Sequence, residues 1–93
     1  MQGSATVKTL VTIQNQLGLH ARPAMAFVDL ANRFASDISV SKGSQTVDGK
    51  SIMQMMMLAA TKGTKLEIHA QGNDAEQATS ELVELVNRKF DEE

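Results

Sequence analysis

Hydrophobic and polar residues alternate along four short stretches of the chain, which is the pattern of β-strands with one buried and one solvent-facing side. These stretches are residues 6–13, 37–41, 45–48 and 65–71, and the last is the most regular. Lys42-Gly43-Ser44 separates the two middle stretches and is predicted to form a turn. The pattern therefore predicts four half-buried strands, with the middle two joined as a hairpin.

Between these strands the apolar residues recur every three or four positions, which predicts amphipathic helices. One helix is predicted from Pro23 onward, with a buried stripe that reaches Phe34. A short second helix is predicted over residues 52–58, with Ser51 as its N-cap and Lys62-Gly63 closing the segment. The stripe of the first helix consists of Ala24, Phe27, Val28, Ala31 and Phe34.

A third helix is predicted to run to about Phe90. At its start we expect a capping box, formed by Asn73 with Glu76 or by Asp74 with Gln77. Its buried stripe is expected to contain Ala75, Ala78, Leu82, Leu85 and Val86.

Each predicted strand has a single apolar face and each long helix a single apolar stripe, so the elements can bury these surfaces by packing in two layers. The sequence predicts an α+β fold in which a four-stranded, mainly antiparallel sheet carries helices on one face and water on the other. A fully parallel sheet would need strands that are apolar on both faces. The length of 93 residues predicts a single domain over residues 1–93.

The composition argues against several classes of function. A net charge of −2 gives no bulk attraction to nucleic acid or to an anionic membrane. The chain has no cysteine and therefore no disulfide or thiolate metal site, which is typical of cytoplasmic proteins. No signal peptide or membrane span is predicted. Residues 1–5 are interpreted as a frayed end, and Asp91-Glu92-Glu93 as a solvated tail.

The candidate chemistry lies in Gly18-Leu19-His20-Ala21-Arg22-Pro23-Ala24, where a strand pattern stops and a helical pattern begins. Proline is tolerated in the first helical turn, so Pro23 places His20 at or near the N-cap. Unpaired backbone N–H groups and the positive end of the helix dipole would then lie beside the imidazole, and Arg22 adds a permanent positive charge. These groups favour a neutral, nucleophilic ring that can carry a phosphoryl group. The alternative is a histidine that only satisfies backbone groups at the helix start.

The sequence lacks the other features that an enzyme of this chemistry needs. It contains no cluster of metal ligands, no glycine-rich phosphate loop and no pair of carboxylates, so no metal and no cofactor are predicted. The chain is therefore interpreted as a covalent phosphoryl carrier rather than an enzyme, and other proteins must supply and take the group. His69, the second histidine, is interpreted as a surface residue of a strand.

Residues 18–24 resemble the active-site signature of the HPr family, the histidine-containing phosphocarriers of the bacterial phosphoenolpyruvate-dependent phosphotransferase system. Residues 47–53 resemble its second signature, and residues 72–75 its third. The resemblance implies an open-faced β-sandwich of βαββαβα order, with sheet order 1-4-2-3 and three helices on one face. It also implies that His20 takes a phosphoryl group on Nδ1 from phosphorylated enzyme I and passes it to an enzyme IIA histidine, while Arg22 stabilises the phosphate.

Ser51 matches the serine that an ATP-dependent HPr kinase/phosphorylase phosphorylates in many relatives. The alternative function is therefore a regulatory module that acts mainly through phosphorylated Ser51 and recruits a transcription regulator. Serine is also a common N-cap residue, and helix capping alone would explain the presence of Ser51. Neither function involves nucleic acid or a membrane, and we expect a monomer because a small carrier must pass between its partners.

The run of residues 52–58, Ile-Met-Gln-Met-Met-Met-Leu, is too apolar for a wholly exposed helix. Flexible methionine side chains suit a surface that docks against several different proteins. Met55 and Met57 are expected to pack in the core, and Gln54 stands where the family often has glycine or lysine. From the resemblance, the partner surface is predicted to consist of Ala21, Met25, Ile52, Met53 and Met56.

Overall fold

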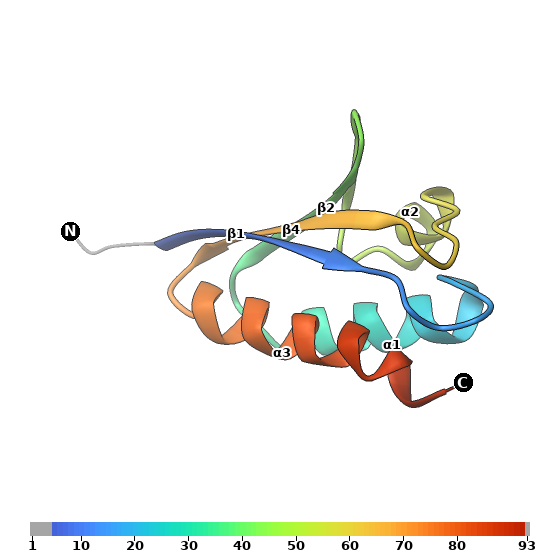
Figure 1. Ribbon diagram of the computed structural model, residues 1–93. Helices are drawn as coiled ribbons and strands as arrows, with labels where there is room; N and C mark the ends of the chain where they lie inside the picture. The colour runs from blue at the N-terminus through green and yellow to red at the C-terminus, as the bar shows by residue number, and fades with distance from the viewer. Residues whose placement is uncertain (1–4, 93) are drawn as a thin grey trace.

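The computed structural model describes residues 5–92, in which four strands and three α-helices follow one another in the predicted order βαββαβα (Figure 1). The strands are β1 (Ala5–Thr12), β2 (Asp37–Lys42), β3 (Gln45–Asp48) and β4 (Lys65–Gly72). The helices are α1 (Ala21–Ala31), α2 (Ile52–Met57) and α3 (Ala75–Asn87), and a short 3₁₀ turn, η1 (Lys89–Asp91), follows α3.

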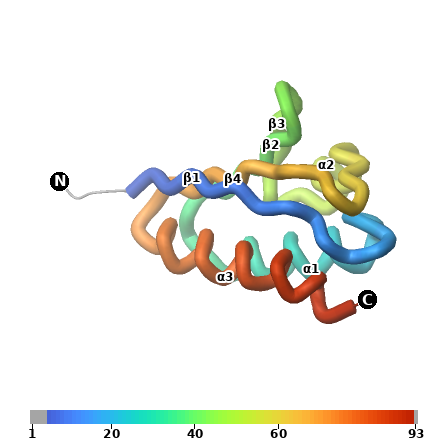
Figure 2. The backbone as a smooth tube through the Cα atoms, in the orientation of Figure 1, coloured from blue at the N-terminus to red at the C-terminus, as the bar shows by residue number. Residues whose placement is uncertain are grey.

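The four strands form one antiparallel sheet in the order β1-β4-β2-β3. α1 and α3 lie beneath this sheet in Figures 1 and 2, and α2 packs against α1 and β3. The predicted α+β architecture with sheet order 1-4-2-3 is therefore confirmed. Most of the predicted frayed end lies outside the described residues, but Ala5 belongs to β1 and pairs with Gly72.

Alternate side chains of each strand point toward the helices, as expected for a pleated strand with one buried face. Val40 and Ile68, which are neighbours across β2 and β4, have no exposed surface. The other side of the sheet is mostly polar, since Lys8, His69 and Ser39 are direct neighbours across β1, β4 and β2. Leu10 lies on this side and is 70% exposed. The predicted half-buried strands are confirmed. The helices complete the core with Ala24, Phe27, Ala31, Met55, Ala75, Ala78, Leu82 and Val86.

Two of the helices end earlier than the sequence predicts: α1, and α3, which ends at Asn87 rather than at about Phe90. α1 ends at Ala31, and Phe34 packs half-buried from the turn that follows it. α2 ends at Met57, within one residue of the predicted end, but Lys62-Gly63 does not close it, since Ala59 already has a φ of +48°. Apolar residues just beyond a helix can reach the same core, which is why the stripe overestimates the helical length.

The expected capping box of α3 does not form. Asp74 is the N-cap, but its carboxylate reaches across to the chain between α1 and β2 instead of capping its own helix. It accepts hydrogen bonds from the backbone N–H groups of Ala35 and Ser36, both at 2.9 Å, and from the Ser36 hydroxyl. The Ser36 hydroxyl, followed by the Ala35 N–H, lowers the pKa of Asp74 below its ordinary value of 3.8. The carboxylate thus ties the start of α3 to the start of β2.

Removing this charge should destabilise the fold in a pH-dependent way. Because the pKa is lowered in the folded state, the stabilisation is fully present above the unfolded-state pKa and is lost as the pH falls through the folded-state pKa. We expect Asp74→Asn to lower the melting temperature at pH 7 by about 5 °C. The difference from the original chain should shrink below about pH 4. Asp29→Asn, at an exposed position of α1, is the control, and equal shifts in both variants at all pH values would contradict the assignment.

Candidate functional site

The loop between β1 and α1 is shaped by Gly18. This residue has a φ of +69°, a conformation that glycine adopts without the steric cost that other residues have. A Cβ at this position would lie 2.5 Å from the carbonyl oxygen of Ala60 and 2.9 Å from Cα of Thr61. The next N–H, that of Leu19, donates to the same Ala60 oxygen at 2.8 Å. Close contact with the segment before β4 therefore fixes the backbone immediately before His20.

His20 is the N-cap of α1, as the sequence predicts. Its backbone is extended, with φ −81° and ψ −171°, and its side chain makes no capping hydrogen bond. The first N–H groups of the helix therefore have no partner within the helix, and the positive end of the helix dipole lies at this point. Pro23 stands in the first turn, where its missing N–H is harmless. The imidazole is neither buried nor used as a cap, since 37% of the side chain is exposed.

Arg22 lies in the same first turn and is exposed. Near the end of the described chain, the carboxylate of Glu92 contacts His20, and the hydrogen bond with His20 is the main cause of its lowered pKa. The charge of Arg22 is a smaller contribution in the same direction, so its field reaches this site. A guanidinium beside open helical N–H groups is suited to binding a phosphate.

The structure adds Glu92 to the site, which the sequence analysis misses. Glu92 Oε1 lies 2.9 Å from His20 Nε2 and accepts a hydrogen bond from Asn15 Nδ2, also at 2.9 Å. The hydrogen bond with His20 is the largest cause of a lowered pKa for Glu92; the bond from Asn15 lowers it further, while burial opposes the shift. Only 21% of the Glu92 side chain is exposed. The predicted solvated tail is therefore wrong at Glu92, although Asp91 is exposed and Glu93 lies outside the described residues.

A left-handed turn brings Glu92 to His20. Lys89, Phe90 and Asp91 have φ values of 59°, 54° and 61°, a conformation that is uncommon for residues other than glycine. Phe90 is buried in the core, which anchors the turn. The C-terminal end of the described chain consequently returns to the start of α1 (Figure 1). No local pattern in the sequence marks such a turn.

The predicted partner surface is largely exposed in the structure. Ala21 is exposed and Ile52 is half-buried, while Met55 packs in the core as predicted. The prediction for Met57 is wrong, because 65% of it is exposed, and Leu17, in the loop before His20, is 74% exposed. We define the methionine surface as Met25, Met53, Met56 and Met57, which are 55%, 77%, 44% and 65% exposed.

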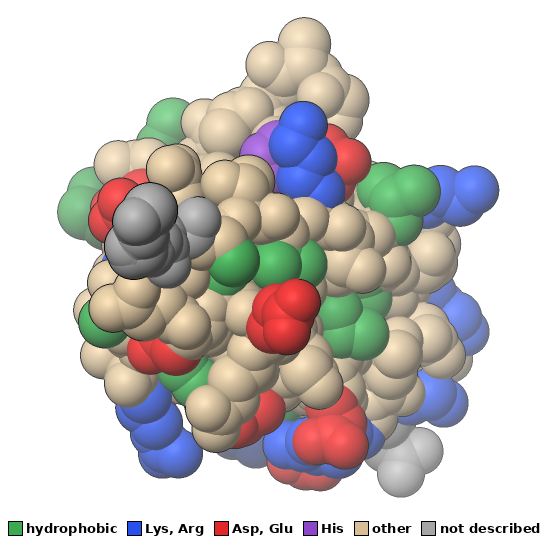
Figure 3. All heavy atoms as spheres, turned by 90° about the vertical axis from the view of Figure 1, so that its left-hand side faces the viewer, with side chains coloured by type: hydrophobic (Ala, Val, Ile, Leu, Met, Phe, Trp, Pro, Cys, Tyr) green, Lys and Arg blue, Asp and Glu red, His purple; other side chains and the backbone are tan. Residues whose placement is uncertain are grey.

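The methionine surface is formed by α1 and α2, which contact each other. The opposite end of the molecule, where the described chain begins, shows hydrophobic side chains only in small separate groups (Figure 3). A six-residue helix is too short for its apolar spacing to separate the buried methionine from the exposed ones, which explains the error at Met57.

Ser51 caps α2 as predicted, since its Oγ accepts the N–H of Gln54 at 3.2 Å. The Gln54 side chain in turn accepts the N–H of Asp48 at 2.9 Å. Gln54 therefore fixes the turn between β3 and α2. The family resemblance shows only that Gln54 replaces the glycine or lysine that is frequent in the family, and it does not indicate this structural role. The Ser51 side chain is half-buried and adjoins the methionine surface in sequence.

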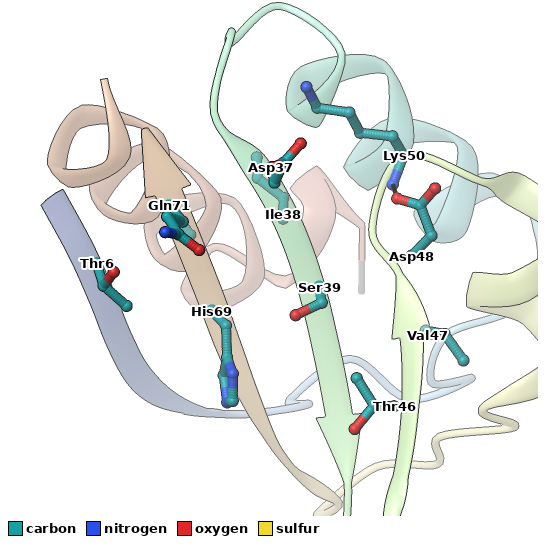
Figure 4. Close-up of a pocket in the computed structure, with 11 residues that line it drawn as sticks. Thr6, Asp37, Ile38, Ser39, Thr46, Val47, Asp48, Lys50, His69 and Gln71 are labelled. Atoms are coloured by element: carbon teal, nitrogen blue, oxygen red, sulfur yellow. Dashed lines mark hydrogen bonds between the residues drawn. The ribbon is translucent and has the colours of Figure 1, made fainter. Parts of the chain in front are cut away.

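His69 lies on the open face of the sheet, as predicted, with Nε2 2.7 Å from Glu67 Oε1. It borders a shallow hollow of about 480 Å³ that runs across the four strands and contains neither His20 nor Arg22 (Figure 4). In Figure 4 the labelled His69, Ser39 and Thr46 come from neighbouring strands.

Two classes of site are not found in the described part of the chain. Between residues 5 and 92, no three His, Cys, Asp or Glu side chains lie together as metal ligands. Over the same residues, no helix has both the length and the apolar character required to span a membrane.

Residues 7–88 match the protein family described as the PTS HPr component phosphorylation site. The phosphocarrier protein HPr of Pseudomonas aeruginosa is 51% identical over 83 residues, covering 88% of this chain and 92% of that protein. The structure also resembles that of HPr-C-His from Thermoanaerobacter tengcongensis, with a TM-score of 0.90, 42% identity and coverage of 94% and 98%. An HPr dimer from the same organism matches with a TM-score of 0.76 at 44% identity, covering 88% of this chain and 94% of that one.

Proposed function

Because the chain belongs to the HPr family of the phosphotransferase system, we propose that His20 accepts a phosphoryl group from phosphorylated enzyme I and passes it to an enzyme IIA histidine. Members of this family are phosphocarrier proteins rather than catalytic enzymes. The observation that carries the proposal is the position of His20 at the open start of α1, partly exposed and not engaged as a cap. The carrier would serve sugar uptake and its regulation.

The arrangement around His20 suits reversible transfer. Nδ1 attacks the phosphorus of a donor phosphohistidine, and the donor N–P bond breaks as the bond between Nδ1 and phosphorus forms. The N–H groups of Ala21 and Arg22 have no partner within α1 and can donate to the phosphate oxygens, and the Arg22 guanidinium offsets their charge. The resulting phosphoramidate keeps a high transfer potential, so the acceptor histidine can take the group by the same displacement.

The methionine surface supports docking of two different partners. Unbranched, polarizable methionine side chains adapt to differently shaped surfaces. We propose that the carrier acts as a monomer, because a small protein that passes a phosphoryl group on must leave one partner before it meets the next. We place the transfer cycle in the cytoplasm, where the family's phosphoryl donors and acceptors meet.

Labelling tests the proposal directly. Incubation with labelled phosphoenolpyruvate and enzyme I should attach one phosphoryl group per chain, and the N–P bond should make the label acid-labile and base-stable. Incubation with ATP alone should give no labelled histidine. A chain that stays unlabelled with cognate enzyme I, or whose label survives acid, would exclude the phosphohistidine carrier.

Ser51 supports a second, regulatory function. It is half-buried at the N-cap of α2, two residues before Met53 of the methionine surface, and a phosphate there would be compatible with the helix dipole. Its negative charge would alter an otherwise apolar docking surface. HPr kinase/phosphorylase would add this phosphate, and a transcription regulator would bind the modified form.

A charge at Ser51 should therefore slow phosphorylation of His20 without destabilising the chain. We expect Ser51→Asp to reduce the rate with enzyme I by about tenfold, because a desolvated or repelled charge weakens docking. Ser51→Asn is the matched control, since asparagine is an equally good N-cap without the charge. Both melting temperatures should stay close to that of the original chain, and equal phosphorylation rates would refute the coupling.

A further inference from the structure

A carboxylate and a buried amide hold the imidazole of His20 from the side opposite to the phosphorylated nitrogen. We propose that Glu92, held by Asn15, is a positioning residue that accepts the Nε2 proton of His20 and so leaves the lone pair of Nδ1 free to attack phosphorus. The inference rests on the proposed phosphocarrier function. It adds to the site two residues that lie outside the signature segment, one in the preceding loop and one near the end of the chain.

The side chains of His20 and Asn15 meet at the same oxygen atom of Glu92. A single oxygen, Glu92 Oε1, lies 2.9 Å from His20 Nε2 and 2.9 Å from Asn15 Nδ2. The carboxylate is shielded from water more than the ring, with 21% of its side chain exposed against 37% for His20. Among the described residues, the hydrogen bond of the His20 ring runs through Nε2.

The charge of Glu92 decides which nitrogen of His20 carries the proton. Its hydrogen bond with His20 lowers the pKa of Glu92 below its ordinary value of 4.5, the bond from Asn15 and the charges of His20 and Arg22 act in the same direction, and burial opposes them. At neutral pH the carboxylate is therefore ionised and can only accept hydrogen bonds. The proton between the two groups then belongs to Nε2, and a neutral imidazole with Nε2–H has its lone pair on Nδ1.

Asn15 orients the carboxylate. It has no exposed surface, and its Nδ2 donates to the Gly18 carbonyl at 2.7 Å as well as to Glu92. These two acceptors fix the amide, and they leave its Oδ1 buried with no hydrogen-bond partner in the part of the chain that the structure describes. An unpaired buried oxygen is destabilising. The amide is therefore held in this orientation by its two donated bonds, and it connects the loop before His20 to the carboxylate.

The chain reaches this position through an unfavourable backbone conformation. Three consecutive residues of η1 have positive φ. The turn is supported by the burial of Phe90 and by the ion pair between Arg88 Nε and Asp91 Oδ1, at 3.0 Å. Two backbone hydrogen bonds close it, from the Asp91 N–H to the Arg88 carbonyl at 3.0 Å and from the Glu92 N–H to the Lys89 carbonyl at 2.9 Å. Such unfavourable backbone conformations are kept only where contacts with the surrounding structure stabilise them. They are frequent at functional sites.

The proton on His20 Nε2 determines what Glu92 does during phosphoryl transfer. As Nδ1 attacks phosphorus and the donor N–P bond breaks, positive charge develops on the His20 ring. The proton stays on Nε2, where the Glu92 carboxylate stabilises this charge. Carboxylates that orient metal-bound histidines act in the same way, and their loss typically reduces affinity or activity by about 10- to 100-fold.

Nitrogen-15 NMR of the unphosphorylated protein tests the tautomer without any partner. At a pH at which the rings are neutral, His20 Nδ1 should have the shift of an unprotonated nitrogen and Nε2 that of a protonated one. Glu92→Ala should move both shifts toward those of a free imidazole, which exchanges between tautomers. His20 shifts that are the same in both proteins would overturn the proposal.

The pair of His69 and Glu67 is a matched control within the same chain, because its Nε2 to Oε1 contact is 2.7 Å long. The chain has only two histidines, so each ring can be followed separately. Glu67→Ala should change the shifts of His69 and leave those of His20, and its phosphorylation rate should match that of the original chain. A change of His20 in Glu67→Ala would mean that the signal reports a general effect of removing acidic residues.

The rate of phosphorylation by enzyme I tests whether the Nε2–H tautomer of His20 matters for phosphoryl transfer. We expect Glu92→Ala to be phosphorylated by enzyme I at least about tenfold more slowly, measured at a temperature at which both chains are fully folded. An unchanged rate in a chain that enzyme I does phosphorylate would overturn the positioning role alone. If the original chain takes up no phosphoryl group, the proposed function itself fails, whatever the NMR spectra show.

Discussion

His20→Ala is expected to take up no phosphoryl group from enzyme I, a complete loss rather than a reduced rate. The imidazole supplies the nucleophilic nitrogen, and no other described residue lies at the start of α1 with both a ring nitrogen and the open N–H groups beside it. The measurement is labelling with phosphoenolpyruvate and enzyme I, followed to completion. Any stoichiometric acid-labile label on the variant would contradict the assignment of His20.

The His20→Ala variant should lose phosphorylation because the nucleophilic nitrogen is absent, and not because the chain unfolds. The side chain of His20 is 37% exposed and makes no capping hydrogen bond, so its removal leaves the helix start and the core intact and costs only the hydrogen bond with Glu92. The unfolding midpoint of the variant should therefore stay near that of the original chain. His69→Ala is the matched control: it removes the other imidazole from the open face of the sheet and should be phosphorylated at the original rate.

The sequence predicts the fold and the centre of the site because both depend on short-range patterns. Alternation marks the buried side of each strand, and the register of the sheet agrees with it: Val40 and Ile68 lie on the same side as neighbours. The change of period at Pro23, together with the histidine before it, places His20 at a helix start. Each of these inferences uses residues that are close together in the sequence.

The errors at Asp74 and Glu92 have a common cause, since both involve partners that are distant in the sequence. Asp74 has a plausible capping box nearby, but the N–H groups of Ala35 and Ser36 bind its carboxylate instead. Glu92 has the composition of a solvated tail, and only a buried Phe90 and a turn with positive φ bring it to His20. Local propensity contains no information about either partner.

Gly18→Ala is expected to cause the largest loss of stability among these changes, about 3 kcal/mol or more. Alanine at a φ of +69° costs about 1–2 kcal/mol by itself. In addition, the new Cβ would lie 2.5 Å from the Ala60 carbonyl oxygen, which is backbone and cannot rotate away. A loss of this size is a large fraction of the stability of a small domain. Urea unfolding at neutral pH measures it.

Gly43→Ala separates the two causes, because Gly43 also has a positive φ, +59°, but no atom lies within 4 Å of its Cβ position. We expect a loss of only about 1–2 kcal/mol there, the conformational part alone. Gly18→Ala should also slow phosphorylation under conditions in which it is still folded, since relief of the overlap must lengthen the bond from Leu19 N–H to Ala60 and displace the backbone that leads into His20. Equal losses of stability at the two glycines would show that the contact with Ala60 does not fix this loop.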